Sequence, residues 1–190
     1  MKKFQVLTDS TSDVVKELRE EFGLDYVKMV FNIDGVEYDA DLDWNVISPK
    51  DYYDKMRNGS RSITGLPLFG EFQEKFRKYL EQGMDILFIG CSTKLSGTIN
   101  NAQLVASELL NEFPDRRIIC FDSLRTNYAE GLMAIDAAKM ALEGKELDDV
   151  VDYLNNNLLN YQVHATVDTL QFLKLAGRIK ASTAFFGSLF

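Results

Sequence analysis

Short apolar runs alternate along the chain with longer segments in which apolar residues recur every three or four positions. Residues 4–8, 86–91 and 118–121 are dominated by apolar side chains, as is typical of strands that are covered on both faces of a parallel sheet. Residues 26–33 predict another strand, which ends in a turn at Asp34 and Gly35. The chain is therefore expected to build a sheet from these runs.

The segments between the runs have the spacing of amphipathic helices. We expect the first helix to begin at Ser12 or a neighbouring capping residue and to end at Gly23. A short helix is expected to open at Ser48–Pro49, because proline is favoured at the first helical position. Longer helices are predicted over residues 70–82, 96–113 and 131–142. This alternation predicts a parallel sheet between two layers of helices, a three-layer α/β/α domain.

The pattern changes towards the end of the chain. Residues 162–167 alternate between polar and apolar side chains, which predicts a half-exposed strand. Residues 181–190 are apolar to the last position, whereas terminal residues are usually polar. We therefore expect an α/β domain over residues 1–158 and the start of a truncated α+β domain over residues 159–190. Because exposed apolar segments favour association, residues 181–190 are expected to form a helix that docks on the first domain or, preferentially, on a second copy of the chain.

The composition argues against several classes of protein. With 21 basic and 29 acidic residues the net charge is -8, so the chain repels phosphate backbones and no nucleic-acid partner is expected. It has neither a run long enough to span a bilayer nor a signal-peptide apolar region, which favours a cytoplasmic location. Two cysteines and one histidine predict neither a disulfide framework nor a metal site.

The segment Ser96–Gly97–Thr98 is the most informative candidate for binding chemistry. It follows a predicted buried strand and opens a long helix, whose first amide groups have no partners within the helix and carry partial positive charge. Gly97 would let a ligand approach the backbone, and Ser96 adds a hydroxyl donor. Together they could bind an anion, although on spacing alone Ser96 acting only as a helix cap is the more ordinary explanation.

Hydroxyl-rich and glycine-rich segments elsewhere complete a pattern that resembles the DegV family. The matching segments, in chain order, are Thr8–Thr11, Thr64–Phe72, Ser92–Thr98, Asp122–Ser123 and Leu170–Ile179. The resemblance implies a two-domain protein that holds a long-chain fatty acid between its domains and needs no other cofactor. It also implies that Thr64, Ser96 and the amide of Gly97 hold the acyl carboxylate. Arg178 would contact the head group or a separate fatty acid kinase to which the carrier presents its ligand.

A competing hypothesis is a dihydroxyacetone-kinase-like enzyme or another phosphate-handling α/β enzyme. Such a kinase needs a histidine that holds its substrate or a set of carboxylates for magnesium. The single histidine, His164, falls in a predicted strand, and the acidic residues show no magnesium-binding spacing. We therefore expect a carrier without catalytic residues, while a purely structural module with a fully packed core is the third alternative.

Overall fold

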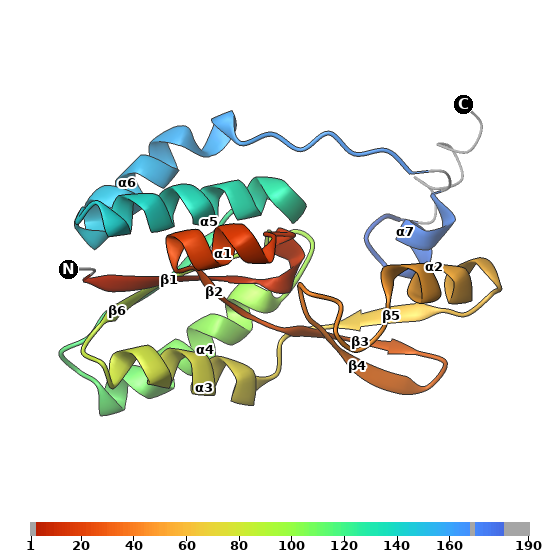
Figure 1. Ribbon diagram of the computed structural model, residues 1–190, viewed down its shortest axis with the longest axis horizontal. Coiled ribbons are helices and arrows are strands. Elements are labelled where there is room, and N and C mark those ends of the chain that lie inside the picture. The colour runs from red at the N-terminus through yellow and green to blue at the C-terminus, as the bar shows by residue number, and fades with distance from the viewer. Residues whose placement is uncertain (1–2, 168–169, 181–190) are drawn as a thin grey trace.

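The computed structural model describes residues 3–167 and 170–180, and its centre is a four-stranded parallel sheet (Figure 1). The strand order is β2-β1-β6-β7, and every neighbouring pair is parallel. The strands are β1 (Phe4–Asp9), β2 (Asp25–Val27), β6 (Asp85–Gly90) and β7 (Ile118–Asp122). The apolar runs therefore form the predicted parallel sheet.

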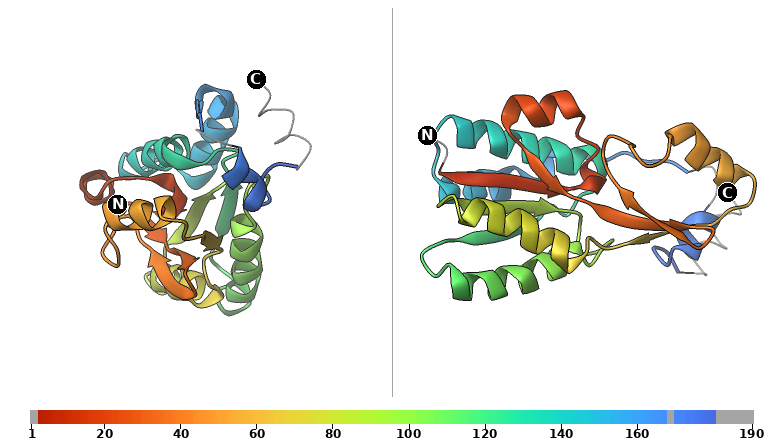
Figure 2. Two further views of the ribbon diagram at one scale, coloured as in Figure 1. Left: turned by 90° about the vertical axis from the view of Figure 1, so that its right-hand side faces the viewer. Right: turned by 60° about the horizontal axis from the view of Figure 1, so that its bottom comes forward.

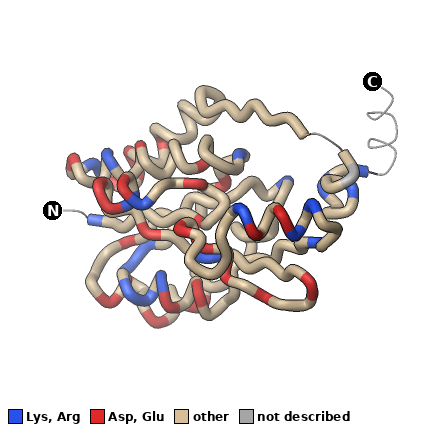
Figure 3. Tube along the Cα trace, turned by 45° about the vertical axis from the view of Figure 1, so that its right-hand side comes forward, with Lys and Arg blue, Asp and Glu red and all other residues tan. Residues whose placement is uncertain are grey.

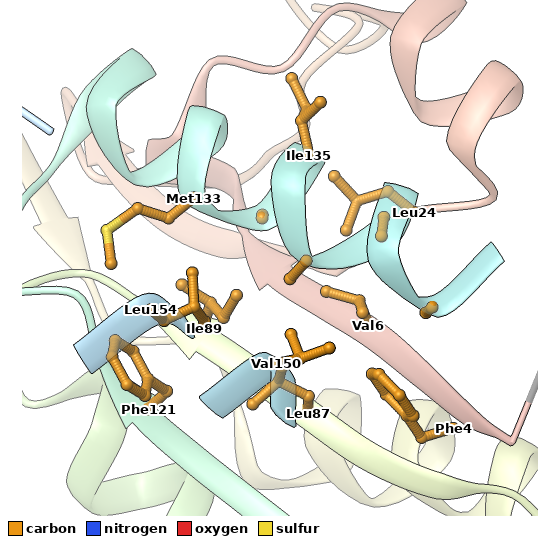
Figure 4. Packing of buried hydrophobic residues seen from close by; sticks show 14 of the residues in the cluster. Phe4, Val6, Leu24, Leu87, Ile89, Phe121, Met133, Ile135, Val150 and Leu154 are labelled. Carbon is orange, nitrogen blue, oxygen red and sulfur yellow. The ribbon is translucent and has the colours of Figure 1, made fainter. Parts of the chain in front are cut away.

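Helices cover both faces of this sheet, which confirms the three-layer prediction (Figures 1 and 2). One layer contains α1 (Lys16–Phe22), α5 (Asn127–Leu142) and α6 (Leu147–Asn157), and the other contains α3 (Phe69–Leu80) and α4 (Thr98–Glu112). Two apolar cores result, one on each face. Figure 4 shows the first, in which Val6, Leu87 and Ile89 of the sheet meet side chains of α5 and α6.

The first helix begins later than the sequence predicts. Ser10–Ser12 form a short 3-10 turn, η1, which is capped by the Asp9 side chain, and α1 starts only at Lys16. The proposed cap at Ser12 is therefore wrong: Asp9 caps only the η1 turn, and the N-cap position of α1 is Val15, whose side chain makes no capping hydrogen bond. Gly23 ends α1 as predicted, in the left-handed conformation with φ of 57°.

The run at residues 26–33 is not one strand but two strands in different sheets. Asp25–Val27 pairs with β1, whereas β3 (Met29–Ile33) is the central strand of a small antiparallel sheet with order β4-β3-β5. Its partners are β4 (Val36–Ala40) and β5 (Ser62–Gly65), and α2 (Pro49–Arg57) lies between them in the chain. The predicted turn at Asp34 and Gly35 and the helix start at Ser48–Pro49 are both confirmed.

After α6 and the turn η2 (Leu158–Asn160), residues 162–167 cross the molecule in extended form, and α7 (Gln171–Leu175) lies near α2 (Figure 1). Residues 162–167 are exposed and form no strand, so that prediction is wrong. A strand requires a neighbouring strand to bond its backbone, and the described part of the chain offers none to this segment. The predicted helix within residues 181–190 lies outside the described residues.

Candidate functional site

The carboxyl ends of β1, β6 and β7 carry the polar segments that the sequence singles out. Asp9, at the end of β1, is fully buried. Its carboxylate accepts hydrogen bonds from the backbone N–H of Thr11 at 2.8 Å and of Cys91 at 3.0 Å. Similarly, Asp122 accepts from the Leu124 N–H at 2.9 Å. These carboxylates fasten loops to strands, so both residues have a structural role here.

A second buried carboxyl group, Glu130 of α5, lies beside Asp9. The hydroxyl of Thr8 donates to Glu130 Oε1 at 3.1 Å, and the Thr11 hydroxyl lies within hydrogen-bonding distance of both carboxyl groups. Burial raises the pKa of Glu130 well above its usual value, and the negative charge of Asp9 adds to this shift. The single Thr11 proton cannot serve both acids, so burial and the neighbouring carboxylate favour the protonated form of Glu130 over its charged form.

Close packing of α5 on the η1 turn creates this arrangement. A Cβ atom at Gly131 would lie 2.4 Å from the carbonyl oxygen of Ser12 and 2.7 Å from Val14 Cγ2. Glycine therefore permits the contact that brings Glu130 against the end of β1. Glu130 was not predicted from the sequence. The only hint of its buried position is that it stands between the small residues Ala129 and Gly131 in an alanine-rich helix.

The predicted anion-binding segment opens α4, a helix of 15 residues. Ser96 is half-buried, and its Oγ lies 2.8 Å from Thr98 Oγ1 and accepts only a long, 3.4 Å bond from the Thr98 N–H. Gly97 occupies the capping position. Within residues 3–167 and 170–180 its N–H has no hydrogen-bond acceptor. Ser96 is thus a weak cap, and the helix end keeps donors for an anion.

The Thr64 loop lies against this helix end. Thr64 is an exposed residue of β5, paired in register with Phe31 of β3. Two residues later, Leu66 Cδ1 lies 3.2 Å from the position that a Gly97 Cβ would occupy. The structure therefore brings the loops of Thr64 and Gly97 side by side, although they are distant in the sequence.

Thr64 also lines a cavity of about 340 Å³ between β5, α2 and α7. The cavity is walled mainly by apolar side chains, among them Met56, Ile63, Phe172, Leu173 and Leu175. Arg178, which is exposed and donates to the Ala176 carbonyl, lines the same cavity. Ser96 is not among its described lining residues. Thr64 and Arg178 therefore share this cavity, whereas Thr64 is linked to Gly97 only through the nearby side chain of Leu66.

His164 lies in the extended segment rather than in a strand, and it lines an open depression with Lys94 and Arg125. Among the described residues, no group of three or more His, Cys, Asp or Glu side chains could hold a metal ion. No helix in the same part of the chain is long and apolar enough to cross a membrane. Figure 3 shows acidic and basic positions interspersed along the trace, while the extended segment has none.

Known proteins are similar to this chain in sequence and in fold. The family model described as "Uncharacterised protein, DegV family" matches residues 3–190. A DegV domain-containing protein of Clostridium perfringens is 35% identical over 189 residues, which is 100% of this chain and 65% of the relative. The chain thus spans less than two thirds of the length of this curated relative.

Two solved structures are also similar. One, entitled "Fatty Acid Binding of a DegV family Protein from Thermus thermophilus", has a TM-score of 0.82 and 33% identity, and the match covers 98% of this chain and 64% of that one. The other, a stearic acid-binding protein from Eubacterium ventriosum, has a TM-score of 0.79 and 26% identity, with coverages of 94% and 61%.

Proposed function

The chain belongs to the DegV family, and we propose that it binds one long-chain fatty acid without covalent chemistry. The carboxylate would be held by the Thr64 and Ser96 hydroxyls and the Gly97 amide. The observation that carries this proposal is the contact of Leu66 with Gly97, which sets the Thr64 loop beside the free N-terminal end of α4. The fatty acids bound by the relatives from Thermus thermophilus and Eubacterium ventriosum support the ligand class.

The physical chemistry of the site suits this ligand. Helix N-terminal amides and hydroxyl groups stabilise a carboxylate without a cationic side chain. Each buried methylene group adds roughly 0.8 kcal/mol, so a long acyl chain supplies most of the gross affinity. The apolar cavity of about 340 Å³ that Thr64 lines is where we place the part of the chain next to the head group.

We propose a carrier rather than an enzyme. Asp9 and Glu130, the two acids buried at the end of β1, have no solvent exposure and are hydrogen-bonded to hydroxyl and amide groups, so neither could reach a substrate. In the carrier role, the exposed Arg178 would contact a fatty acid kinase. Incubation with ATP, magnesium and fatty acid should yield acyl phosphate only when such a kinase is added. Product from the pure chain would favour the phosphate-handling alternative.

Native mass spectrometry of the purified chain tests ligand binding directly, and the expected result is a co-purified fatty-acid mass. Ser96→Ala and Thr64→Val should each weaken binding in a lipid titration by about 1–3 kcal/mol, because a buried carboxylate oxygen loses its donor. Ser107→Ala, an exposed serine later in α4, is the matched control and should bind normally. A chain that neither carries nor takes up fatty acid would contradict the proposal.

The proposal also includes a domain boundary, a cytoplasmic location and self-association of the chain. A domain boundary near residue 158 is supported by the end of α6 at Asn157 and by the exposed segment that follows, and limited proteolysis should cut within residues 162–167. The unpaired thiols Cys91 and Cys120 suit the reducing cytoplasm. Self-association through the apolar residues 181–190 would appear in light scattering as a mass that rises with concentration.

A further inference from the structure

A second cavity, of about 470 Å³, differs in chemistry from the one that we assign to the acyl chain. It lies between η1, the β3–β4 hairpin, the loop of residues 41–47 and α2. Its lining residues are Ser10, Asp13, Val15, Phe31, Asp39, Ala40, Asp41, Leu42, Trp44, Val46, Ile47, Tyr52, Tyr53 and Thr64. The described lining thus combines four aromatic rings and three carboxyl groups, and it contains neither lysine nor arginine.

The aromatic rings form a continuous cluster around this cavity. Tyr52 meets Trp44 at a centroid distance of 5.6 Å and Tyr53 at 5.2 Å, both edge-on. Tyr52 also packs edge-on against the buried Phe31, so these two rings serve as core. Trp44 and Tyr53, however, remain 38% and 48% exposed, which leaves negative ring faces available to a ligand.

The carboxyl groups leave this cavity with uncompensated negative charge. Asp39 pairs with Lys28 at 2.7 Å. Asp41 accepts only from neutral donors: the N–H groups of Asp43 at 2.8 Å and Asn45 at 3.2 Å, and the side-chain amide of Asn45 at 2.9 Å. Asp13 likewise accepts from an amide, that of Asn127, at 3.1 Å. Within the described part of the chain, neither Asp13 nor Asp41 has a cationic partner.

The guanidinium group of Arg19, which pairs with Asp43 of the same loop, does not neutralise them. Arg19 is buried, and its Nη2 atom lies 2.7 and 2.6 Å from the two carboxylate oxygens of Asp43. It also lies 4.9 Å over the ring of Tyr26. Its position is thus fixed by other partners, and the charge of Asp41 and Asp13 faces the cavity without an internal counter-ion.

We propose that this cavity binds a small organic cation through a quaternary or alkylated ammonium group. Ring faces attract such a group by cation–π interaction, most strongly for tryptophan, and two free carboxylates supply the opposite charge. Tyr52 and Thr64 line both cavities, whereas Trp44, Tyr53, Asp13 and Asp41 line only this one. The site adjoins the proposed fatty-acid site, but the groups assigned to the cation are different ones, and the inference goes beyond that function.

Trp44 is the only tryptophan of the chain, so its fluorescence reports on this cavity alone. Titration with choline should give a saturable change in Trp44 emission. The matched neutral compound is 3,3-dimethylbutan-1-ol, which has the same shape without the charge, and it should bind about tenfold more weakly or not at all. Equal binding of the neutral compound would identify an apolar cavity and overturn the proposal, as would the absence of any saturable change.

Substitutions test separately whether the aromatic rings and the carboxylates of this cavity bind the cation. Tyr53→Ala and Asp41→Asn should each weaken choline binding several-fold, whereas Tyr128→Ala and Asp149→Asn, which lie outside the cavity lining, should not. Asp13→Asn is a second carboxylate variant that should fold, because Asp13 has a φ of 54°, which asparagine tolerates well. If choline binding is unchanged in both carboxylate variants, the proposal is wrong. Fatty-acid uptake, measured on the same variants, should stay normal.

Discussion

The parallel sheet and the small antiparallel sheet differ in how far the side chains in and around them are buried. In β6 of the parallel sheet, Leu87, Phe88 and Ile89 have no solvent exposure, and the buried carboxylate of Asp9 at the end of β1 is hydrogen-bonded within the protein. The small sheet buries side chains of its central strand β3, but α2, the helix that covers it, has no buried residue, and the neighbouring rings of Trp44 and Tyr53 are 38% and 48% exposed. Both cavities discussed above open on this second region. The molecule thus separates the part that supplies stability from the part that offers binding surface.

The same substitution in the two regions gives the largest expected difference. Phe88 packs edge-on against Phe72 at 5.3 Å, so Phe88→Ala should lower the free energy of unfolding by about 3–5 kcal/mol through lost burial and a cavity. Tyr53→Ala, in the exposed cluster, should cost less than about 1 kcal/mol. Urea denaturation measures both values. Similar losses for the two variants would remove the contrast between the regions.

Backbone packing within the parallel region should be the next most sensitive feature. Gly131→Ala places a methyl group 2.4 Å from the Ser12 carbonyl oxygen, and the resulting displacement of α5 should cost about 1–3 kcal/mol. Gly70→Ala is the matched control, because nothing lies within 4 Å of its Cβ position in α3. That variant should be neutral or slightly more stable. A tolerated Gly131→Ala would show that α5 and η1 can separate freely.

Asp25 is the first residue of β2, where the chain is about to leave the parallel sheet, and its substitution tests how far its polar contacts stabilise the fold at this point. Burial alone would raise the pKa of Asp25, but hydrogen bonds from Lys75 at 2.8 Å and Tyr79 at 2.6 Å outweigh it and lower the pKa. Asp25→Asn should therefore cost about 1–2 kcal/mol at neutral pH. A group with a lowered pKa stabilises the fold above its ordinary value, here 3.8, and this stabilisation disappears as pH falls through the lowered pKa.

The control for Asp25 is Asp148→Asn. Asp148 pairs with Arg117 at 2.6 Å, but both side chains are largely exposed, so its loss should be close to zero. Chemical denaturation between pH 3 and pH 7 separates the two cases. A loss for Asp25→Asn that does not shrink in acid would contradict the ionic explanation.

Glu130→Gln should have the smallest effect and the opposite pH dependence. Near the ordinary glutamate pKa of 4.5, the raised pKa keeps Glu130 protonated and neutral. Glutamine is also neutral, so at that pH the variant and the wild type should have the same free energy of unfolding. Since a raised pKa means that the folded state holds a proton the unfolded state has lost, wild-type stability falls as pH rises above that value. The variant should therefore become the more stable protein at higher pH. Glu143→Gln, an exposed position at the end of the same helix, should show no such trend.

Periodicity in the sequence predicted the parallel region well and the small sheet poorly, for a physical reason. Buried strands such as residues 86–91 and inward-facing helix positions leave strong local patterns, and the sheet and its helical layers followed from them. The division of residues 26–33 between two sheets depends on a change of partner strand, which no local pattern records. The same holds for residues 162–167, whose alternation was interpreted as a strand although no described strand lies beside them.

The candidate site shows the same limit. Hydroxyl-rich strand ends could be recognised, and the structure places the Thr64 loop against Gly97 as the resemblance requires. The site residues themselves stay predictions that the variants above will test. The sequence could not indicate the Asp9–Glu130 pair, because its members are 121 positions apart and meet only through the close contact at Gly131. The aromatic and acidic cavity also depends on how α2 folds over β3.

The path of the chain through the small sheet has a consequence for how this protein can change. The backbone leaves the parallel layer after Val27 and rejoins it at Phe69, the start of α3, which packs against β2. Residues 28–68 therefore form an insertion between two elements of the parallel layer and are tied to it by contacts such as the Arg19–Asp43 pair. None of their strands belongs to the parallel sheet, so exposed side chains of this insertion, including those of α2, can be replaced without removing a hydrogen bond between parallel strands. Ligand preference can thus diverge between copies of this architecture while the scaffold stays the same.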